Sequence, residues 1–505
     1  MKLNYKRTIF VGFAFFLICA FWQAYDTIIP KILTDKFGMS QTLSGVIMAA
    51  DNVLALFLLP LFGAVSDKCK NKRGRRTPFI IFGTIAAAAF FVVLSFADDL
   101  QIKQLAPVAV DNPTAQETLY DAGLTATTPD GETFVVQEEF TREEFVAIAM
   151  KDADGGTNPD YTNYVVPARQ AYAAQATAAN NLPLILFIGI LLLVLLSMAT
   201  FRSPAVALMP DVTIKPLRSK ANAVINLMGA AGGIIVLILG MVFGTGKAEN
   251  ALMSYTLFFA VISGLMLGSL LIFLWKVKEP QLVREMHEES AKYGIETEET
   301  DENSGDRRKS LLLILASVVL WFFGYNAVTS KYAVYASNVL DLDYNATLTI
   351  ATGAAIVSYI PVGAVASKIG RRKTILAGIV ILGGAFLAGS FIRAGSSPLV
   401  MNILFALAGV GWATINVNSY PMVVELSRGG DVGRYTGFYY TASMAAQTIT
   451  PIFSGFLMDK LAMTVLFPYG SACVLLAFVT MLFVKHGDNK PTPVSKLEAL
   501  GGGDD

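Results

Sequence analysis

Residues 63–76 read GAVSDKCKNKRGRR, and residues 363–373 repeat the pattern as GAVASKIGRRK. Each basic run directly follows a long apolar segment. Positive clusters between apolar segments are typical of loops held on the cytoplasmic side of a membrane. Because one copy lies in each half of the chain, the pair also indicates an internal repeat. The copies are unequal, since Ser367 stands in the second where Asp67 stands in the first.

The composition agrees with a membrane location. Of the 505 residues, 54% are hydrophobic and only 15% are charged, against roughly 25% charged residues in soluble domains. The 39 Lys and Arg balance the 39 Asp and Glu, so the net charge gives no support for a nucleic-acid partner. The three cysteines (Cys19, Cys69 and Cys473) cannot form a disulfide framework outside the membrane.

Twelve apolar segments come close to the ~20 residues that cross the hydrocarbon core of a bilayer. They predict helices over residues 8–30, 42–65, 78–97, 182–209, 221–243, 255–275, 311–330, 344–366, 374–392, 399–424, 435–457 and 464–484. The first segment is predicted to be a retained helix rather than a signal peptide, because it lacks a small-residue cleavage site. The basic loops fall on one side together with both termini. We therefore expect a multi-pass protein of the plasma or inner membrane with cytoplasmic termini.

A second pair of sites tests the repeat. Asp211 with Arg218 follows the fourth predicted helix, and Glu425 with Arg434 follows the tenth. These sites lie 214 residues apart, whereas the basic motifs lie 300 apart, so the N-terminal half must hold 86 extra residues. The chain is thus predicted to contain an N-terminal six-helix bundle (1–275) with an extracytoplasmic insertion (98–181), a cytoplasmic linker (276–310), a C-terminal six-helix bundle (311–485) and a cytoplasmic tail (486–505).

The insertion is strongly acidic. It holds fourteen Asp or Glu and four Lys or Arg, a net charge of about −10. Thr141 and Glu144 have the spacing of a capping box and predict a short helix. Pro129-Asp-Gly131 predicts a turn before a strand at Phe134. Two interpretations are open: a lid over an entrance between the bundles, or a small external subdomain that takes no part in function.

These motifs resemble those of the major facilitator superfamily, through Gly63, Asp67 and the Arg73-Gly-Arg75-Arg76 run with its weaker copy. More narrowly, residues 60–79 are similar to the loop between helices 2 and 3 of sucrose-transporter-like proteins, which border the glycoside–pentoside–hexuronide:cation symporters. Arg202-Ser-Pro204 and the stretch from Gly433 to Gly437 support this similarity. The resemblance implies an all-α membrane protein of the major facilitator fold, with twelve transmembrane helices in two pseudo-symmetric six-helix bundles.

Only three charged side chains lie within the predicted spans: Asp26, Asp51 and Arg202. An ionisable group in hydrocarbon costs roughly 2.5–3.5 kcal/mol, so such groups are functional candidates. At 1.5 Å per residue, Asp26 lies on the order of 6 Å below the outer end of its helix. Asp51 lies about 14 Å below the outer end of its own helix, and Arg202 lies roughly 25–30 Å below, near the inner face.

Asp26 is the favoured coupling or substrate carboxylate. Asp26 is expected to be buried, and a buried carboxyl group can alternate between protonated and ionised forms during a transport cycle. It can equally bind Na⁺ or a sugar hydroxyl. The alternatives are an interfacial acid beside Lys31 for Asp26, and a polar lock between helices for Asp51 with Asn52. Plant-type sucrose transporters keep a carboxylate in their fourth helix, but residues 191–196 contain no acid. The family's coupling chemistry therefore does not carry over directly.

A mixture of aromatic and amide side chains on helical faces is what a sugar site requires, because rings pack on C–H surfaces and amides bind hydroxyls. Within the superfamily, helices 1, 4, 7 and 10 line the cavity, and this resemblance favours Trp321 and Asn416. For each residue, a helix–helix hydrogen bond or an interface ring is the alternative. The coupling or substrate candidates are Asp26, Asp51, Gln23, Tyr25, Asn52, Asn226, Trp321, Tyr325, Asn326, Trp412, Asn416, Tyr440 and Gln447.

A second group of residues is predicted to gate the protein at its cytoplasmic side. Asp67 is expected to pair with basic groups or a helix end in one conformational state; alternatively, the basic run only fixes the topology. Arg202 is expected to neutralise Asp211, Glu425 or Asp67 there rather than to pair with Asp26. The gating candidates are Asp67, Arg73, Arg75, Arg76, Arg202, Asp211, Arg218, Arg371, Arg372, Glu425 and Arg434.

The sequence thus predicts a secondary active transporter that couples uptake of a sugar or glycoside to H⁺ or Na⁺ by alternating access. The alternatives are a facilitator-type exporter of drugs or other small molecules, and a non-transporting membrane sensor or binding protein. An enzyme is not expected, since the loops hold no nucleophile–base or metal-ligand constellation. The expected partners are the lipid bilayer and a small-molecule substrate, with no obligate protein partner, no metal site and no cofactor apart from the transported ion.

Overall fold

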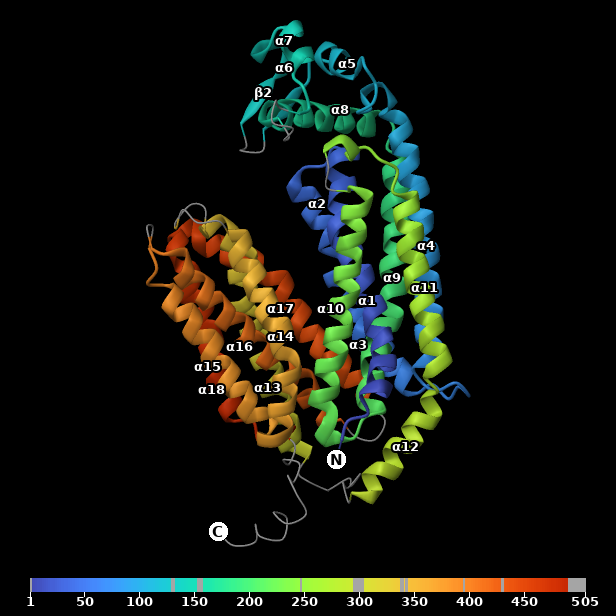
Figure 1. Cartoon of the computed structure of the whole chain (residues 1–505), viewed down its shortest axis with the longest axis vertical. Helices are drawn as coiled ribbons and strands as arrows, with labels where there is room; N and C mark the ends of the chain where they lie inside the picture. The colour runs from blue at the N-terminus through green and yellow to red at the C-terminus, as the bar shows by residue number, and fades with distance from the viewer. Residues whose placement is uncertain are drawn as a thin grey trace.

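The computed structural model describes residues 2–128, 132–151, 158–245, 248–293, 304–336, 340, 344–393, 396–427 and 431–488. In this part of the chain the regular structure is almost entirely helical, and the helices form two bundles (Figure 1). The bundles meet at the end that carries the N-terminus and diverge toward the end that carries the insertion. We call these the basic end and the insertion end.

The N-terminal bundle contains six long helical segments. They are α1 (Tyr5–Lys31) with its π-helical continuation η1 (Ile32–Lys36), α2 (Gln41–Met48) with α3 (Ala50–Asp67), α4 (Thr77–Gln104), α9 (Leu182–Asp211), α10 (Arg218–Phe243) and α11 (Thr256–Lys276). The turns η4 (Lys215–Leu217) and η5 (Ala248–Asn250) flank α10, and α12 (Glu279–Lys292) follows the bundle.

The C-terminal bundle contains the other six. They are α13 (Ser304–Tyr335), α14 (Tyr344–Ile369), α15 (Arg371–Gly389), α16 (Pro398–Glu425), α17 (Val432–Lys460) and, after the turn η7 (Met463–Val465), α18 (Leu466–Leu482). Each of the twelve predicted spans coincides with one of these helical segments, which confirms the predicted fold class. In the predicted linker, α12 is the surface helix; residues 294–303, and residues 489–505 of the predicted tail, lie outside the described part.

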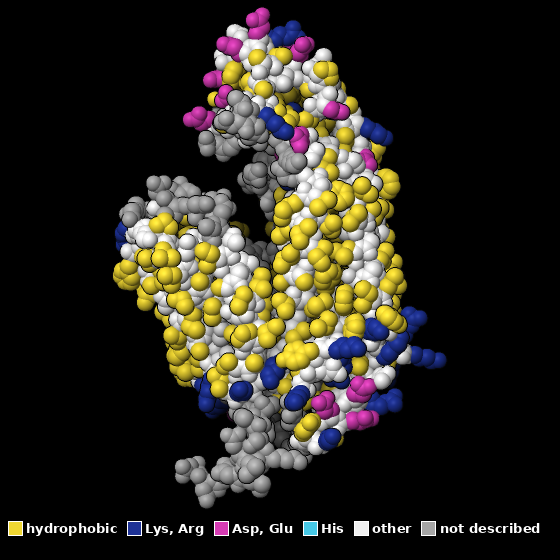
Figure 2. Space-filling view, viewed as in Figure 1, with side chains coloured by type: hydrophobic (Ala, Val, Ile, Leu, Met, Phe, Trp, Pro, Cys, Tyr) yellow, Lys and Arg dark blue, Asp and Glu magenta, His cyan; other side chains and the backbone are white. Residues whose placement is uncertain are grey.

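The surface of the bundles is apolar. Ten of the described helices are long and apolar enough to cross a membrane, and α18 is a shorter apolar helix. Large side chains such as Phe57 and Val357 are 72% and 76% exposed. Figure 2 shows a hydrophobic band with Lys and Arg gathered at the basic end and acidic side chains over the insertion. An apolar surface of this extent requires lipid, so the chain is a multi-pass membrane protein.

The first transmembrane helix is longer than the sequence predicts. After Pro30 the chain continues in η1 to Lys36, and Thr34 donates its hydroxyl to the Pro30 carbonyl in that segment. Asp26 therefore lies ten residues before the helix end, or roughly 15 Å rather than 6 Å. The second span is also interrupted, because α2 ends at Met48 and α3 starts at Ala50.

The insertion is a small separate unit with its own apolar core. Its elements are η2 (Ala106–Val108), α5 (Ala115–Asp121), β1 (Thr125–Thr127), β2 (Thr133–Val135), α6 (Val136–Glu139), α7 (Arg142–Ala147), η3 (Tyr161–Val165) and α8 (Val166–Ala179). Strands β1 and β2 are antiparallel, with Ala126 opposite Phe134. The predicted boundary at residue 98 lies inside α4, which runs to Gln104.

Two local predictions for the insertion are confirmed. Thr141 caps α7 and Glu144 completes the capping box, while Phe134 lies in strand β2; the predicted turn at 129–131 is outside the described residues. The insertion is fixed to the N-terminal bundle, because Gln170 of α8 donates to Asp35 at 2.9 Å and Thr177 donates to the Phe37 carbonyl at 3.1 Å.

At the basic end the two bundles pack closely through α3 and α17, and through α10 and α14. The approach of α3 to α17 depends on glycine, because a Cβ at Gly63 would collide with the Gly433 carbonyl, and one at Gly437 would collide with Pro60. Small residues at a helix crossing let backbones approach in this way. The structure is thus closed at the basic end and open at the insertion end.

Candidate functional site

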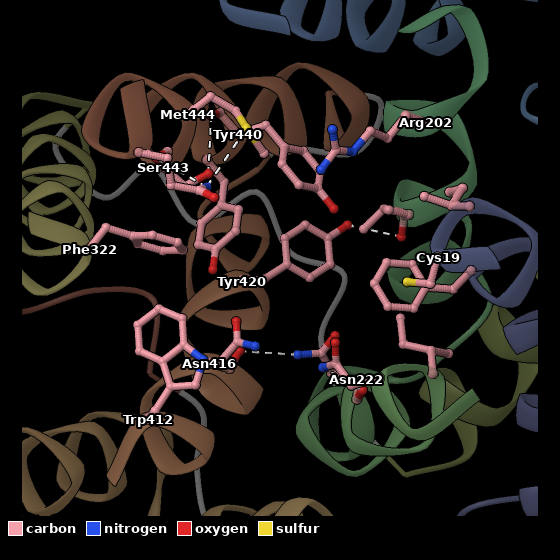
Figure 3. A pocket seen from close by; sticks show the side chains of 17 residues that line it. Cys19, Arg202, Asn222, Phe322, Trp412, Asn416, Tyr420, Tyr440, Ser443 and Met444 are labelled. Carbon is pink, nitrogen blue, oxygen red and sulfur yellow. Dashed lines mark hydrogen bonds between the residues drawn. The ribbon is translucent and has the colours of Figure 1, made fainter. Parts of the chain in front are cut away.

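A central cavity of about 250 Å³ lies between the two bundles (Figure 3). It is formed by α1, α9 and α10 on one side and by α13, α16 and α17 on the other. The lining side chains are Phe15, Ile18, Cys19, Arg202, Val206, Asn222, Ile225, Asn226, Phe322, Trp412, Asn416, Tyr420, Tyr439, Tyr440, Ser443, Met444 and Gln447. The predicted residues Asn226, Trp412, Asn416, Tyr440 and Gln447 are therefore brought together.

Arg202 also lines this cavity and is the only charged side chain among the described residues of its lining. Its guanidinium carbon lies 5.0 Å from the ring centre of Trp22 and 5.1 Å from that of Tyr440, so it is held between aromatic rings of the two bundles. The prediction that it neutralises an acid at the gate is wrong, because those three acids have other partners. Helix α9 turns Arg202 toward the cavity before it reaches the basic end.

An aromatic wall forms one side of the cavity. The rings of Trp412 and Tyr325 are stacked, with centres 3.9 Å apart and planes 3° apart, and Phe322 meets Trp412 edge-on at 5.0 Å. Trp321 is fully buried and is not among the residues that line the cavity. Its Nε1 and the Nδ2 of Asn326 are buried, and the described residues give neither a hydrogen-bond acceptor.

Amides and hydroxyls also line the cavity, and some of them link the bundles. Asn222 of α10 donates to the Val417 carbonyl of α16 at 2.8 Å, and more weakly to that of Asn416 (Figure 3). The Tyr420 hydroxyl donates to the Val206 carbonyl at 3.0 Å, again between bundles. Gln447 donates to its own helix at 3.3 Å. The cavity thus offers stacking surfaces beside several hydrogen-bonding groups, a combination that suits a small polar ligand.

The two membrane carboxylates lie beside the cavity and are not part of its lining. Asp26 is exposed and Asp51 half-buried, and the described residues give neither side chain an ion pair. Both are close enough to Arg202 to interact with it electrostatically. The buried environment expected for Asp26 is not observed, because the bundles diverge at the insertion end.

Three further candidates lie near these acids. Gln23 and Asn52 are half-buried. The Tyr25 side chain is buried, with its hydroxyl lacking a partner among the described residues. The ring of Tyr25 meets that of Trp22 edge-on, with centres 5.2 Å apart. Through Trp22, Tyr25 is therefore adjacent to Arg202.

Asp67 closes the basic end by binding a helix N-terminus across the bundle interface. Its carboxylate accepts the backbone N–H groups of Gly433 and Arg434, each at 2.9 Å, in the first turn of α17. It also pairs with Arg76, which bonds Asp211 at 2.8 Å as well. Arg75 binds the same Asp211 carboxylate at 2.6 Å.

Glu425 forms the corresponding centre in the second half. It pairs with Arg371 at 2.9 Å within its own bundle, and with Arg218 at 3.2 Å from the other bundle. Lys215 lies 3.7 Å from the same carboxylate. Asp211 thus binds arginines of the basic motif in the N-terminal half, and Glu425 binds an arginine of the motif in the C-terminal half. Arg218 binds Glu425 instead of Asp211, its neighbour in the sequence.

Besides Arg202, three other gating candidates form none of these ion pairs. Arg372 donates to the carbonyls of Met481 and Leu482 at the end of α18. The Arg434 side chain lies over the Phe438 ring, so only its backbone reaches Asp67. Arg73 is exposed beside α12.

Sequence reasoning missed charged groups at two sites that position these elements. Glu279 at the start of α12 accepts the N–H groups of Arg75, Arg76 and Thr77, and so caps α4. At the other end, Lys36 and Asp98 form a fully buried pair at 2.6 Å. Both acids lie at or beyond the edges of the predicted spans, so their positions in the sequence indicate a structural role only weakly.

The twelve described helices, the central cavity between the bundles and the closure at one end define a membrane transporter. Residues 170–360 and 342–501 match the family model described as Major Facilitator Superfamily, and residues 10–104 match the model MFS/sugar transport protein. The chain belongs to the Major Facilitator Superfamily. This confirms the resemblance inferred from the basic motifs, and the family and fold are those of transporters rather than enzymes.

The sequence alignments with individual proteins cover small parts of the chain, whereas the structural superpositions cover nearly all of it. Sucrose transport protein SUC4 of Arabidopsis thaliana is 35% identical over 65 residues, 13% of each chain. Putative glycoside/cation symporter YagG of Escherichia coli (strain K12) is 29% identical over 82 residues, 16% of this chain and 18% of that one. These alignments therefore span less than a fifth of the curated relatives.

The structural similarity covers nearly the whole chain. The proton:xylose symporter XylE superposes with a TM-score of 0.57 at 15% identity, covering 98% of both chains. The E. coli fucose:proton symporter FucP superposes with a TM-score of 0.60 at 11% identity, covering 96% of this chain and 100% of that one. At these identities the likeness concerns the fold.

Proposed function

We propose that this protein is a secondary active transporter that couples uptake of a sugar or glycoside to H⁺ or Na⁺ by alternating access. The observation that carries the proposal is the central cavity, which combines stacked aromatic rings with amides and one arginine between two bundles closed at only one end. We further propose that the basic end is cytoplasmic, since cationic loops are retained there. The described structure then corresponds to an outward-open state.

The cavity chemistry supports a sugar. Trp412, stacked on Tyr325, can pack against the C–H face of a pyranose ring. Asn226 and Gln447 can exchange hydrogen bonds with hydroxyls. The Arg202 guanidinium supplies several donors and makes no hydrogen bond to an acid among the described residues. The names of the sucrose transport and glycoside/cation symporter relatives point to the same substrate class.

Asp26 is the proposed coupling residue, with Asp51 as its partner. In the described state Asp26 is exposed and can take up an H⁺ or Na⁺ from the open side. Closure of the insertion end would remove water from this carboxylate, and desolvation disfavours its charged form unless a cation is bound. Both acids are near Arg202, so binding of H⁺ or Na⁺ to one of them changes the electrostatic field in the cavity.

Release to the basic end requires the interbundle contacts of Asp67 and Glu425 to open. Asp67 is bound to the N-terminus of α17, and Glu425 to Arg218 of the other bundle. These contacts are confined to one end, which favours alternating access over a fixed receptor. An exporter would share this fold and differ in the direction of net transport, which gradient-driven uptake measures.

Proteoliposomes with imposed H⁺ or Na⁺ gradients test the proposal directly. We expect one of the two gradients to drive accumulation of a labelled sugar or glycoside. Asp26→Asn should abolish accumulation and leave substrate exchange without a gradient intact, whereas the exposed Asp111→Asn, far out on the insertion, should change neither. Failure of every tested sugar and glycoside to accumulate would refute the uptake proposal. Unchanged accumulation in Asp26→Asn would refute the coupling role alone.

A further inference from the structure

A second cavity, of about 590 Å³, lies at the basic end outside the transport pathway. It is enclosed by the loop before α4, the last turn of α11 and the first turns of α12. Four cationic side chains and a short apolar floor line it, with no Asp or Glu among the lining residues: Lys72, Arg73, Thr77, Leu274, Val277, Lys278, Pro280, Gln281 and Arg284.

The cations of this cavity are not neutralised by the acids nearest to them in the chain. Glu279 is buried, and its carboxylate is used by the N–H groups of Arg76 and Thr77 at the start of α4. Glu285 pairs with Arg7 and accepts from a side-chain amide. The four cationic side chains form no ion pair with a described acid. An anionic ligand would therefore meet an excess of positive charge.

The position of the cavity selects a lipid over a soluble anion. It adjoins the outward face of α11, where Leu271 is 67% and Trp275 70% exposed. The Lys276 ammonium lies 3.4 Å from the Trp275 ring centre, an arrangement typical of the headgroup layer. Figure 2 shows basic side chains gathered at this level, directly beneath the hydrophobic band. The acyl chains of a lipid bound here could follow α11 into the bilayer.

We propose that this cavity binds the headgroup of an anionic phospholipid. Lys72 and Arg73 would contact the phosphate from the loop before α4, Lys278 from the residue before α12, and Arg284 from α12 itself. Basic pockets at the ends of transmembrane helices bind phosphorylated headgroups in this way. The site does not depend on which substrate the protein transports. It joins the same loop that carries Arg75 and Arg76, so an occupying lipid would also brace the closed basic end.

Fluorescence quenching by brominated lipids tests the proposal, because Trp275 directly follows the lining residue Leu274 and is highly exposed. The purified full-length protein is placed in phosphatidylcholine bilayers that contain a small fraction of brominated phosphatidylglycerol or, separately, brominated phosphatidylcholine. We expect the anionic lipid to quench Trp275 at a lower mole fraction than the neutral one does. Trp275→Phe, which removes the reporter, should remove the difference.

Charge substitutions locate the site. Each lost cation should weaken the preference about fivefold, since a Lys or Arg near anionic lipid contributes roughly 1 kcal/mol. Lys72→Gln with Arg284→Gln should therefore lower it by about 25-fold, whereas Lys368→Gln with Lys373→Gln, an equal charge change at the basic end of the other bundle, should leave it unchanged. Equal quenching by both lipids, or equal effects of the two double variants, would overturn the proposal.

Discussion

Neutralising Asp67 should destabilise the closed state of the basic end. Its carboxylate is the point where α3 holds the N-terminus of α17, through the N–H groups of Gly433 and Arg434 at 2.9 Å each. Asp67→Asn keeps the size of the side chain but has one oxygen acceptor in place of two, and its NH₂ group faces an N–H donor. The variant should therefore lose one interbundle hydrogen bond and the charge that strengthens the other.

The magnitude follows from these contacts. A hydrogen bond to a charged group contributes about 1.5–3 kcal/mol, and an anion at a helix N-terminus about 0.3–1 kcal/mol. Arg76 keeps its bond to Asp211 and is not left unpaired. We therefore expect a loss of about 2–3 kcal/mol from the closed state, which lowers the ratio of closed to open molecules roughly 30- to 150-fold.

Spin-label distance measurements can detect this shift. In a background that lacks Cys19, Cys69 and Cys473, one label pair at Lys70 and Lys368 reports on the basic end. A second pair, at Lys103 and Arg393, reports on the insertion end; all four positions are exposed. Asp67→Asn should lengthen the first distance and shorten the second.

The matched control is Asp111→Asn, the same chemical change at an exposed position on the insertion. It should leave both distance distributions as they are in the unmodified protein. If Asp67→Asn also leaves them unchanged, the contact of Asp67 with α17 does not stabilise closure, and the reasoning fails. A change at the basic end without the opposite change at the insertion end would contradict alternating access.

Two further predictions concern stability. Lys36→Met leaves Asp98 unpaired at a site where both side chains are fully buried, so it should lower the free energy of unfolding in an SDS titration by about 3–5 kcal/mol. The double variant Lys36→Met with Asp98→Leu should recover most of that loss. An equal loss in the single and the double variant would contradict the pairing. In the insertion, hydrogen bonds from Thr141 lower the pKa of Glu144 below 4.5. The contribution of this cap should be complete above pH 4.5 and be lost as the pH falls through the lowered pKa. The loss should appear as lower amide protection factors in α7, and Thr141→Val should make these factors less dependent on pH.

Local patterns in the sequence determined the architecture. Runs of apolar residues located all twelve helices, since crossing a bilayer requires about 20 such residues wherever they occur. The spacing of the motif pairs located the insertion, because a repeat fixes equivalent positions in both halves. The capping box of α7 was also predictable, as both of its hydrogen bonds form within four consecutive residues.

The partners of charged groups were decided by the tertiary structure. Asp211 and Arg218 are neighbours in sequence, yet Asp211 binds Arg75 and Arg76 while Arg218 crosses to Glu425. Which arginine reaches an acid depends on how helix ends from different parts of the chain converge. No local pattern contains that information.

The same distinction holds for the cavity. The sequence supplied an arginine, aromatic rings and amides within apolar helices, and so determined the kind of chemistry available. The rotation of α9 and the meeting of the two bundles decided that Arg202 lies between Trp22 and Tyr440 instead of at the gate. A helix sets the spacing of its side chains, but only packing against its neighbours decides which of its faces turns inward.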